Sequence, residues 1–213
     1  MKILHEDKDI IVCIKPVGIL SQSDSDGGES MITKLCEHSG CEIYPLHRLD
    51  REVGGIMVYA KTKKSASFLS QAIADRSFKK EYIALVHGVP DTPKGEMKDL
   101  LFKDSRKNKS FVVARERKGV KKASLEYEVL NTKEFEDNTF SAVKILLHTG
   151  RTHQIRVQFS SRKHPLAGDR KYGAKDNFKN IGLWSYRLTF LHPDTKEALV
   201  FSCEPENIIK EFI

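Results

Sequence analysis

A single carboxylate in a basic setting is the strongest chemical feature of this chain. The run His-Arg-Leu-Asp at residues 47–50 places Asp50 between Arg48 and Arg51. A neighbouring guanidinium favours the ionised form of a carboxylate, which keeps it available as a nucleophile or a base at neutral pH. The same arrangement on an exposed surface is an ordinary ion pair that contributes little to stability. The spacing alone leaves both interpretations open.

A second basic segment, Gly-Arg-Thr-His-Gln-Ile-Arg-Val, occupies residues 150–157. If this segment is helical, His153 and Arg156 lie three residues apart and share one face of the helix. Together with Arg151 they could contact phosphates without taking part in any reaction. Spacing alone favours this non-catalytic interpretation.

Other catalytic classes find little support in the sequence. A glycoside hydrolase needs two carboxylates across the scissile bond, and the pair Asp50 and Glu52 is more typical of a solvated edge. No Gly-x-Ser-x-Gly elbow, P-loop or dinucleotide fingerprint is present. Four side chains raise the question of zinc: Cys36, His38, Cys41 and His47. Their spacing lacks the usual Cys-x2-Cys knuckle, so no metal site is expected.

Composition favours a folded protein with an anionic partner. The chain has 213 residues, 39% of them hydrophobic, and a net charge of +7. A basic balance favours nucleic acid or another anionic surface, although a merely solvated surface would look the same. No apolar run is long enough to span a bilayer, and acids interrupt the N-terminus too early for a signal peptide. A cytoplasmic protein without membrane contact is expected.

Periodicity predicts many strands and a few helices. The predicted strands cover residues 9–14, 56–60, 82–86, 111–113, 125–130, 140–147, 185–191 and 198–202. The predicted helices cover residues 29–38, 64–77, 152–159 and part of 205–213. A polar loop is expected at residues 21–28, Thr152 is expected to cap the third helix, and one apolar helical stripe comprises Ala66, Leu69, Ile73 and Ala74. This pattern indicates an α+β fold with a mixed, mainly antiparallel central sheet and flanking helices, in a single domain over residues 1–213.

Residues 103–122 are rich in Lys and Arg and poor in acids. They are expected to form a basic hairpin, called the flap below. Glycines at positions 54 and 55 follow Asp50 and suggest that another backbone or a ligand approaches closely there.

Four motifs in the same order resemble the RluA-type pseudouridine synthases. The His-Arg-Leu-Asp run, followed by Gly-Ile-Met-Val at residues 55–58, resembles the catalytic motif of that family. Lys-Pro-Val-Gly-Ile-Leu at residues 15–20 resembles its N-terminal signature, and residues 80–88 resemble its tyrosine strand. The segment 150–157, continuing through residues 164–169 and 172–173, resembles its third motif. The likeness runs from about residue 9 to 202. This chain has Val-Gly-Gly at residues 53–55, where the family commonly has Thr-Ser-Gly.

The resemblance implies the pseudouridine synthase fold and an isomerase that converts specific uridines of RNA to pseudouridine. It implies that Asp50 is the catalytic carboxylate, either as nucleophile or as base at C2′. Arg156 would pair with Asp50, Tyr82 would stack on the uracil, Ile155 would supply an apolar wall, and Arg48 would brace the position of the flipped-out base. No cofactor or metal is implied.

Structured RNA, either rRNA or tRNA, is the implied partner. The residues expected to contact its phosphates are Arg151, His153, Lys118, Lys121 and Lys122. The chain is expected to be a monomer that consists of the catalytic domain. The alternative is a non-catalytic RNA-binding module on the same fold.

Overall fold

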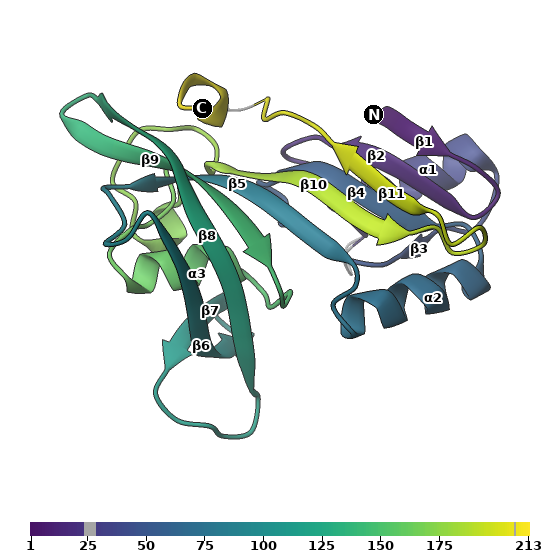
Figure 1. Ribbon diagram of the computed structural model, residues 1–213, viewed down its shortest axis with the longest axis horizontal. Coiled ribbons are helices and arrows are strands. Elements are labelled where there is room, and N and C mark those ends of the chain that lie inside the picture. The colour runs from purple at the N-terminus through teal and green to yellow at the C-terminus, as the bar shows by residue number, and fades with distance from the viewer. Residues whose placement is uncertain (24–28, 207) are drawn as a thin grey trace. The chain divides into compact units, whose positions relative to one another are not determined.

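The structure is a computed structural model that describes residues 1–23, 29–206 and 208–213 (Figure 1). Residues 24–28 of the expected polar loop and residue 207 of the expected C-terminal helix lie outside the described residues. The helices are α1 (Met31–Ser39), α2 (Lys63–Ala74) and α3 (Gln154–Ser161), with 3-10 turns η1 (Arg170–Tyr172) and η2 (Ile208–Glu211). The strands are β1 (Lys2–Glu6), β2 (Ile10–Lys15), β3 (Tyr44–Pro45), β4 (Gly54–Ala60), β5 (Lys79–His87), β6 (Lys94–Asp104), β7 (Lys109–Val113), β8 (Val120–Phe135), β9 (Asn138–Leu147), β10 (Leu183–Leu191) and β11 (Ala198–Ser202).

The strand predictions found the strongly apolar strands and missed strands that are short or rich in charged residues. β1, β3 and β6 were not predicted, and β8 extends well beyond the expected residues 125–130. Charged residues are poor strand formers by themselves, but β6 and β8 hold one another in a continuous antiparallel register from Lys94 opposite Glu128 to Phe102 opposite Val120. Pairing between distant segments therefore sets the length of these strands.

The predicted helices lie at the right positions in the chain, but one predicted buried residue and the length of the C-terminal helix are wrong. α1 begins at the Ser30 cap and ends at Gly40, which adopts the left-handed conformation, as the expected stop predicts. On α2 the buried side chains are Ser65, Leu69 and Ala72, so the predicted stripe is wrong at the exposed Ala74. The C-terminal helix shortens to the turn η2.

The described residues cluster into two compact units. The first comprises Met1–Lys80 and Ser185–Glu204, and the second comprises Glu81–Trp184 and Pro205–Ile213. The single domain expected over residues 1–213 stays a prediction. No helix in the described ranges is long and apolar enough to cross a membrane.

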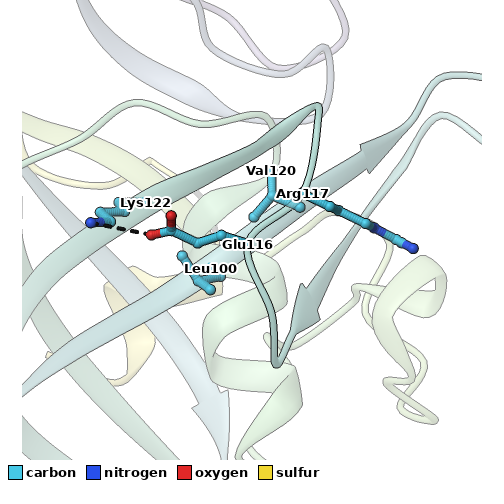
Figure 2. A pocket seen from close by; sticks show the side chains of 5 residues that line it. All are labelled: Leu100, Glu116, Arg117, Val120 and Lys122. Atoms are coloured by element: carbon cyan, nitrogen blue, oxygen red, sulfur yellow. Dashed lines mark ion pairs between the residues drawn. The ribbon is translucent and has the colours of Figure 1, made fainter.

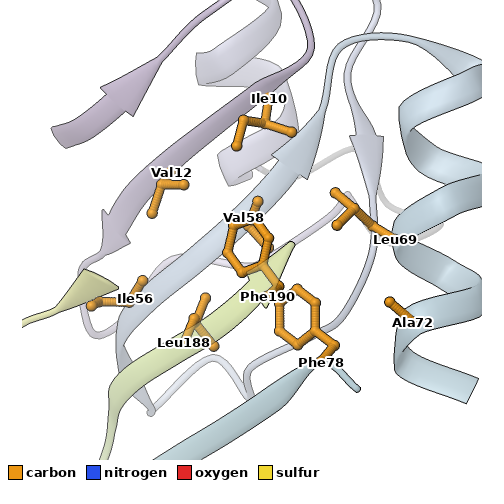
Figure 3. Packing of buried hydrophobic residues seen from close by; sticks show 9 residues of the cluster. All are labelled: Ile10, Val12, Ile56, Val58, Leu69, Ala72, Phe78, Leu188 and Phe190. Atoms are coloured by element: carbon orange, nitrogen blue, oxygen red, sulfur yellow. The ribbon is translucent and has the colours of Figure 1, made fainter. Parts of the chain in front are cut away.

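In the first unit the strands follow the order β1-β2-β4-β10, with β3 paired to β4 and β11 paired to β10. α2 packs against β3 and β4. The core between these elements (Figure 3) contains Ile10, Val12, Ile56, Val58, Leu69, Ala72, Phe78, Leu188 and Phe190. The rings of Phe78 and Phe190 stack with centroids 4.9 Å apart. Burial of each large apolar side chain contributes about 1.5–3 kcal/mol, so this core fixes β4 and the loop that precedes it.

In the second unit the strands follow the order β5-β9-β8-β6-β7. α3 contacts β6, β7 and η1. Leu101 of β6 and Ala123 of β8 pack with Val157 and Tyr172 in a small core. The strand pairs with an assigned register are antiparallel, and a parallel bridge joins Leu20 to Ser30. The expected mixed, mainly antiparallel α+β fold is confirmed.

Candidate active site

Asp50 lies on the loop between β3 and β4, and hydrogen bonds fix the backbone on both sides of it. The Ser21 hydroxyl accepts from the backbone N–H of Leu49 at 3.0 Å and donates to the Leu49 carbonyl at 2.8 Å. The N–H of Val53 donates to the carbonyl of Asp50 at 3.0 Å. Leu49 is buried, Asp50 is half-buried and Arg48 is exposed. The carboxylate is therefore carried on a turn with a fixed backbone.

Lys15 is a buried cation beside this loop. Its side chain lies at the end of β2 and is 0% exposed. The ammonium donates to the carbonyls of Pro16 at 2.9 Å, Ile19 at 2.6 Å and Arg51 at 3.2 Å. Burial lowers the pKa of Lys15 to about 8, and the charge of Asp50 acts in the opposite direction. Lys15 thus ties the residue after Asp50 to the N-terminal signature and places a positive charge near the carboxylate.

His47 anchors the start of the loop to β4. Its Nε2 accepts a hydrogen bond from the N–H of Val58 at 3.3 Å, which places the proton of the neutral ring on Nδ1. Burial lowers the pKa of His47 to about 3, and the charge of Lys80 acts in the same direction. His47 is neutral at physiological pH, and its Nε2 lone pair is engaged by the backbone. This role is structural and differs from the zinc-ligand interpretation considered above.

Gly55 confirms the expected close approach of another backbone. Its φ is +119°, and a Cβ at this position would lie 2.6 Å from the N of Ser185 on β10. The Ser185 hydroxyl donates to the carbonyl of Ile56 at 2.9 Å. A side chain at position 55 would therefore separate β10 from the start of β4.

In the second unit, α3 begins one residue later than its predicted cap. The N-cap is His153 in the left-handed conformation, with φ of 52°, and its side chain makes no capping hydrogen bond. The predicted cap Thr152 is wrong, because it lies one residue before the N-cap. Its carbonyl accepts from the Ser110 hydroxyl at 2.6 Å. The side chain of Gln154 binds the turn instead, since its Oε1 accepts from the N–H of Arg151 at 3.0 Å.

Arg156 forms a buried bidentate ion pair with Asp169. Its Nε lies 2.6 Å from Oδ2 and its Nη2 lies 2.9 Å from Oδ1. The two side chains are 3% and 1% exposed. Two parallel hydrogen bonds fix the plane of a guanidinium as well as its position. The sequence pattern did not indicate Asp169 as a partner of Arg156, and the pairing of Arg156 with Asp50 stays a prediction.

Tyr172 contacts two basic side chains of the third motif, His153 and Arg156. Its ring centroid lies 5.1 Å from the guanidinium carbon of Arg156, and its hydroxyl lies 2.9 Å from Nδ1 of His153. Both side chains therefore contact the same ring, although His153 precedes α3 and does not lie on a face of the helix as expected. The same hydroxyl accepts from the backbone N–H of Ser110 on β7 at 2.8 Å. Tyr172 thus connects the flap to α3, a role that its place in the motif did not reveal.

The flap carries the lysines expected to bind RNA. Lys118, Lys121 and Lys122 are exposed on and before the start of β8. The Arg151 side chain donates through Nε to the carbonyl of Lys122 at 3.0 Å. Lys122 also forms an ion pair with Glu116 at 3.2 Å. The flap therefore contacts the third motif through both of its strands, β7 at Ser110 and β8 at Lys122.

The two apolar contacts expected for the uracil are buried. Tyr82 on β5 is 5% exposed and lies opposite Ile145 of β9. Ile155 on α3 is 4% exposed. Both positions provide rigid apolar surface rather than mobile side chains.

One group of potential metal ligands in the described ranges comprises Asp7, Asp9 and His192. Nδ1 of His192 accepts from the N–H groups of Asp194 at 3.3 Å and Thr195 at 3.1 Å. The proton of the neutral ring is therefore on Nε2, which lies 3.0 Å from Asp7 Oδ2 and donates to it. A cation would need the lone pair of that nitrogen, so the geometry favours a structural hydrogen-bond network.

The family model and the curated relatives that match this chain indicate the same family. Residues 9–161 match the family model of RNA pseudouridylate synthase. An uncharacterized RNA pseudouridine synthase of Aquifex aeolicus is 34% identical over 99% of this chain and 71% of its own length. Ribosomal large subunit pseudouridine synthase C of Buchnera aphidicola subsp. Baizongia pistaciae is 32% identical over 98% of this chain and 68% of its own length.

Two solved structures share the fold. Human RNA Pseudouridylate Synthase Domain Containing 1 superposes with a TM-score of 0.79 at 22% identity, over 96% of this chain and 83% of the other. Human RNA Pseudouridylate Synthase Domain Containing 4 superposes with a TM-score of 0.75 at 24% identity, over 96% of this chain and 89% of the other.

Proposed function

The chain belongs to the RNA pseudouridylate synthase family, and on this premise we propose that Asp50 carries out its reaction on uridine within RNA. The observation that supports this role most is the construction of the Asp50 loop. Ser21 and the buried Lys15 hold its backbone from two sides, and Lys15 brings a positive charge near the carboxylate. A loop built in this way presents one ionised carboxylate in a defined position.

The reaction is an isomerisation without net redox change. The N1–C1′ bond of uridine breaks, the base rotates, and a C5–C1′ bond forms while C5 loses a proton and N1 gains one. Asp50 either attacks C1′ or removes the proton at C2′. Both routes use the carboxylate of Asp50, and the buried ammonium of Lys15 lies near it.

The target base has to leave its stack, at a cost of a few kcal/mol. We assign Arg48 to the position that the base vacates, because Arg48 is exposed beside Asp50. Tyr82 stacks on the uracil and Ile155 lines the pocket, in keeping with their burial on a strand and a helix. Arg156, oriented by Asp169, contributes a buried positive charge to substrate binding.

The RNA phosphates bind Arg151, His153 and the flap lysines. Contacts with phosphates release counterions, so each lost contact reduces the salt dependence of binding by about 0.7–0.9 in the log–log slope. We expect the triple variant Lys118→Gln, Lys121→Gln, Lys122→Gln to lower this slope by about 2 or more. The measurement is RNA affinity across a salt series. An unchanged slope would remove the flap from the RNA-binding surface.

Ribosomal RNA is the proposed substrate, because Buchnera relatives are named for the ribosomal large subunit. Transfer RNA is the alternative. We place the enzyme in the cytoplasm as a monomer. Free thiols at all four cysteines are compatible with a reducing compartment. Light scattering on the purified protein tests the monomer.

The direct test is to incubate the protein with total RNA and to map pseudouridine at each position. New pseudouridine at defined sites of rRNA is expected. Comparison with RNA from cells that lack the protein then identifies the natural sites. Absence of new pseudouridine in every RNA, with RNA binding intact, would favour the non-catalytic binding module.

A further inference from the structure

A hollow of about 420 Å³ lies in the flap, where the segment between β7 and β8 meets the strands (Figure 2). Its size falls within the range of about 300–1,000 Å³ that is typical of small-ligand sites. The lining residues are Leu100, Glu116, Arg117, Val120 and Lys122. All belong to the second unit. Neither the reaction nor the phosphate contacts proposed above account for this hollow.

The register of the strands explains why the hollow has an apolar floor. Leu100 of β6 is opposite Lys122, and Phe102 is opposite Val120. Because side chains alternate along a strand, Leu100 and Phe102 share one face, while Leu101 faces the core under α3. Residues 114–119 cross this face from β7 to β8, and the N–H of Val120 donates to the carbonyl of Arg117 at 3.0 Å to close the turn. Residues 114–119 therefore cover the edge of this apolar face, and the hollow lies between that segment and the strands.

The rim of the hollow is polar and carries both signs of charge. The Glu116 carboxylate lies 3.2 Å from the Lys122 ammonium, and both side chains are mostly exposed. Figure 2 shows this pair on one side of the hollow and Arg117 extending from the other. The Arg117 guanidinium lies 4.8 Å from the ring centroid of Phe102, so a flat cationic surface adjoins the floor.

This combination suits a nucleobase better than a phosphate. A phosphate gains nothing from an apolar floor and is repelled by Glu116. A base has a flat face for apolar or guanidinium contact, and its N–H groups can donate to a carboxylate. The surrounding lysines would bind the phosphates on either side of such a base.

We propose that the flap hollow binds one unstacked nucleobase of the substrate RNA, with the base face on Leu100 and Val120 and its edge at Glu116. This inference rests on the proposed function and adds to it a preference for single-stranded nucleotides at the flap. Stacked bases inside a duplex cannot reach the floor, so the site distinguishes single strands from duplexes.

The first test fills the hollow while keeping every charge. Val120→Phe is compared with wild type, with three fluorescent probes: a 12-nucleotide single-stranded RNA, the matching duplex, and an abasic strand of equal length. We expect affinity for the single strand to fall by about tenfold or more, with duplex and abasic affinities unchanged. The matched control is Val112→Phe, an exposed valine on β7 that pairs with Leu101 and faces away from the hollow.

Equal loss for all three probes, no loss for any, or an equal loss in Val112→Phe would overturn the proposal. Binding is measured here without catalysis, so failure of the hollow is distinguishable from failure of the pseudouridine assay.

The second test asks whether removal of one negative charge raises or lowers RNA affinity. This test does not depend on how the hollow is packed. Glu116→Gln removes a negative charge from a basic surface, which by electrostatics alone should strengthen RNA binding. Recognition of a base edge requires the opposite result, a weaker affinity for the single strand. Glu96→Gln is the control, because Glu96 forms a similar exposed ion pair with Lys98 at 2.7 Å on β6. Stronger single-strand binding in Glu116→Gln would contradict the proposal.

Discussion

At the scale of single residues, the surroundings of Asp50 depend on a buried lysine. Three backbone carbonyls surround the Lys15 ammonium, and one of them belongs to Arg51, the neighbour of Asp50. Hydrogen bonds from a charged donor contribute about 1.5–3 kcal/mol, more than neutral ones. Lys15 therefore holds the position of the loop and places a positive charge near the carboxylate.

Replacement of Lys15 should change both the rate and its pH dependence. Lys15→Met is expected to lower kcat by about 10- to 100-fold, since it removes hydrogen bonds worth about 1.5–3 kcal/mol. The pKa of Lys15 is about 8, so wild-type activity should decline above that pH as the ammonium loses its proton. Pseudouridine formation measured from pH 6 to about pH 10 tests this prediction. A wild-type decline that persists unchanged in Lys15→Met would assign it to another group.

The same pKa has a consequence for stability with a definite sign. Lys15 is protonated in both folded and unfolded states below pH 8, whereas between about 8 and its ordinary value of 10.5 the unfolded state binds more protons. This group therefore makes the folded state relatively more stable as pH rises through that window. Lys15→Met should lack this rise in the free energy of unfolding.

At the scale of elements, the flap and α3 act as one assembly through Tyr172. The Tyr172 hydroxyl contacts His153 before α3 and Ser110 on β7, while its ring contacts Arg156. His153 has a left-handed backbone, which is costly for a residue with a side chain. The Tyr172 hydrogen bond compensates part of that cost, and the same hydroxyl connects the flap to the start of α3.

Tyr172→Phe should change KM for RNA and kcat to different extents. The ring contact with Arg156 is preserved, but the buried N–H of Ser110 loses its acceptor, at a cost of about 1–3 kcal/mol in the free energy of unfolding. We expect KM for RNA to rise more than kcat falls, because the flap loses its anchor. The control is Tyr127→Phe, whose hydroxyl bonds to Thr92 at 3.0 Å outside this assembly. A fall in kcat with unchanged KM would contradict the coupling.

At the scale of the whole molecule, buried groups make stability sensitive to acid. His47 has a pKa of about 3 in the folded state against an ordinary value of 6.5. The unfolded state therefore binds more protons between these values, and stability is lost as pH falls from about 6.5 towards 3. His47→Gln, which retains an acceptor for the Val58 N–H, should flatten the free energy of unfolding in that window. Denaturant titrations at a series of pH values measure it, and an unaltered pH slope in the variant would contradict the assignment.

Asp7 should change the free energy of unfolding in a lower pH range than His47. Burial raises its pKa, but hydrogen bonds from His5, from the N–H groups of Ile10 and Asp9, and from His192 lower it to about 2. Its stabilisation is present above the ordinary value of 3.8 and is lost as pH falls towards 2. This lower window should disappear in Asp7→Asn and remain in His47→Gln.

The sequence predicted the fold class and the places of the apolar strands and of the three α-helices. Those properties follow from local periodicity and from motifs that are continuous in the chain. It did not predict the partner of Arg156, since Asp169 lies thirteen residues away and only the turn at η1 brings its carboxylate to the guanidinium. The role of Lys15 was missed for a related reason, because its acceptors are backbone carbonyls, which leave no pattern in the sequence.

The central claim is that Asp50 is the catalytic carboxylate, and one paired comparison tests it most directly. Asp50→Asn and Glu52→Gln each remove one negative charge from the same loop, and Glu52 is exposed. Pseudouridine is quantified under single-turnover conditions, with the enzyme in saturating excess over the same RNA, and RNA affinity is measured in parallel. We expect Asp50→Asn to bind RNA with nearly wild-type affinity and to form no pseudouridine, while Glu52→Gln retains the wild-type rate. Pseudouridine formation by Asp50→Asn at a rate near that of Glu52→Gln would contradict the claim.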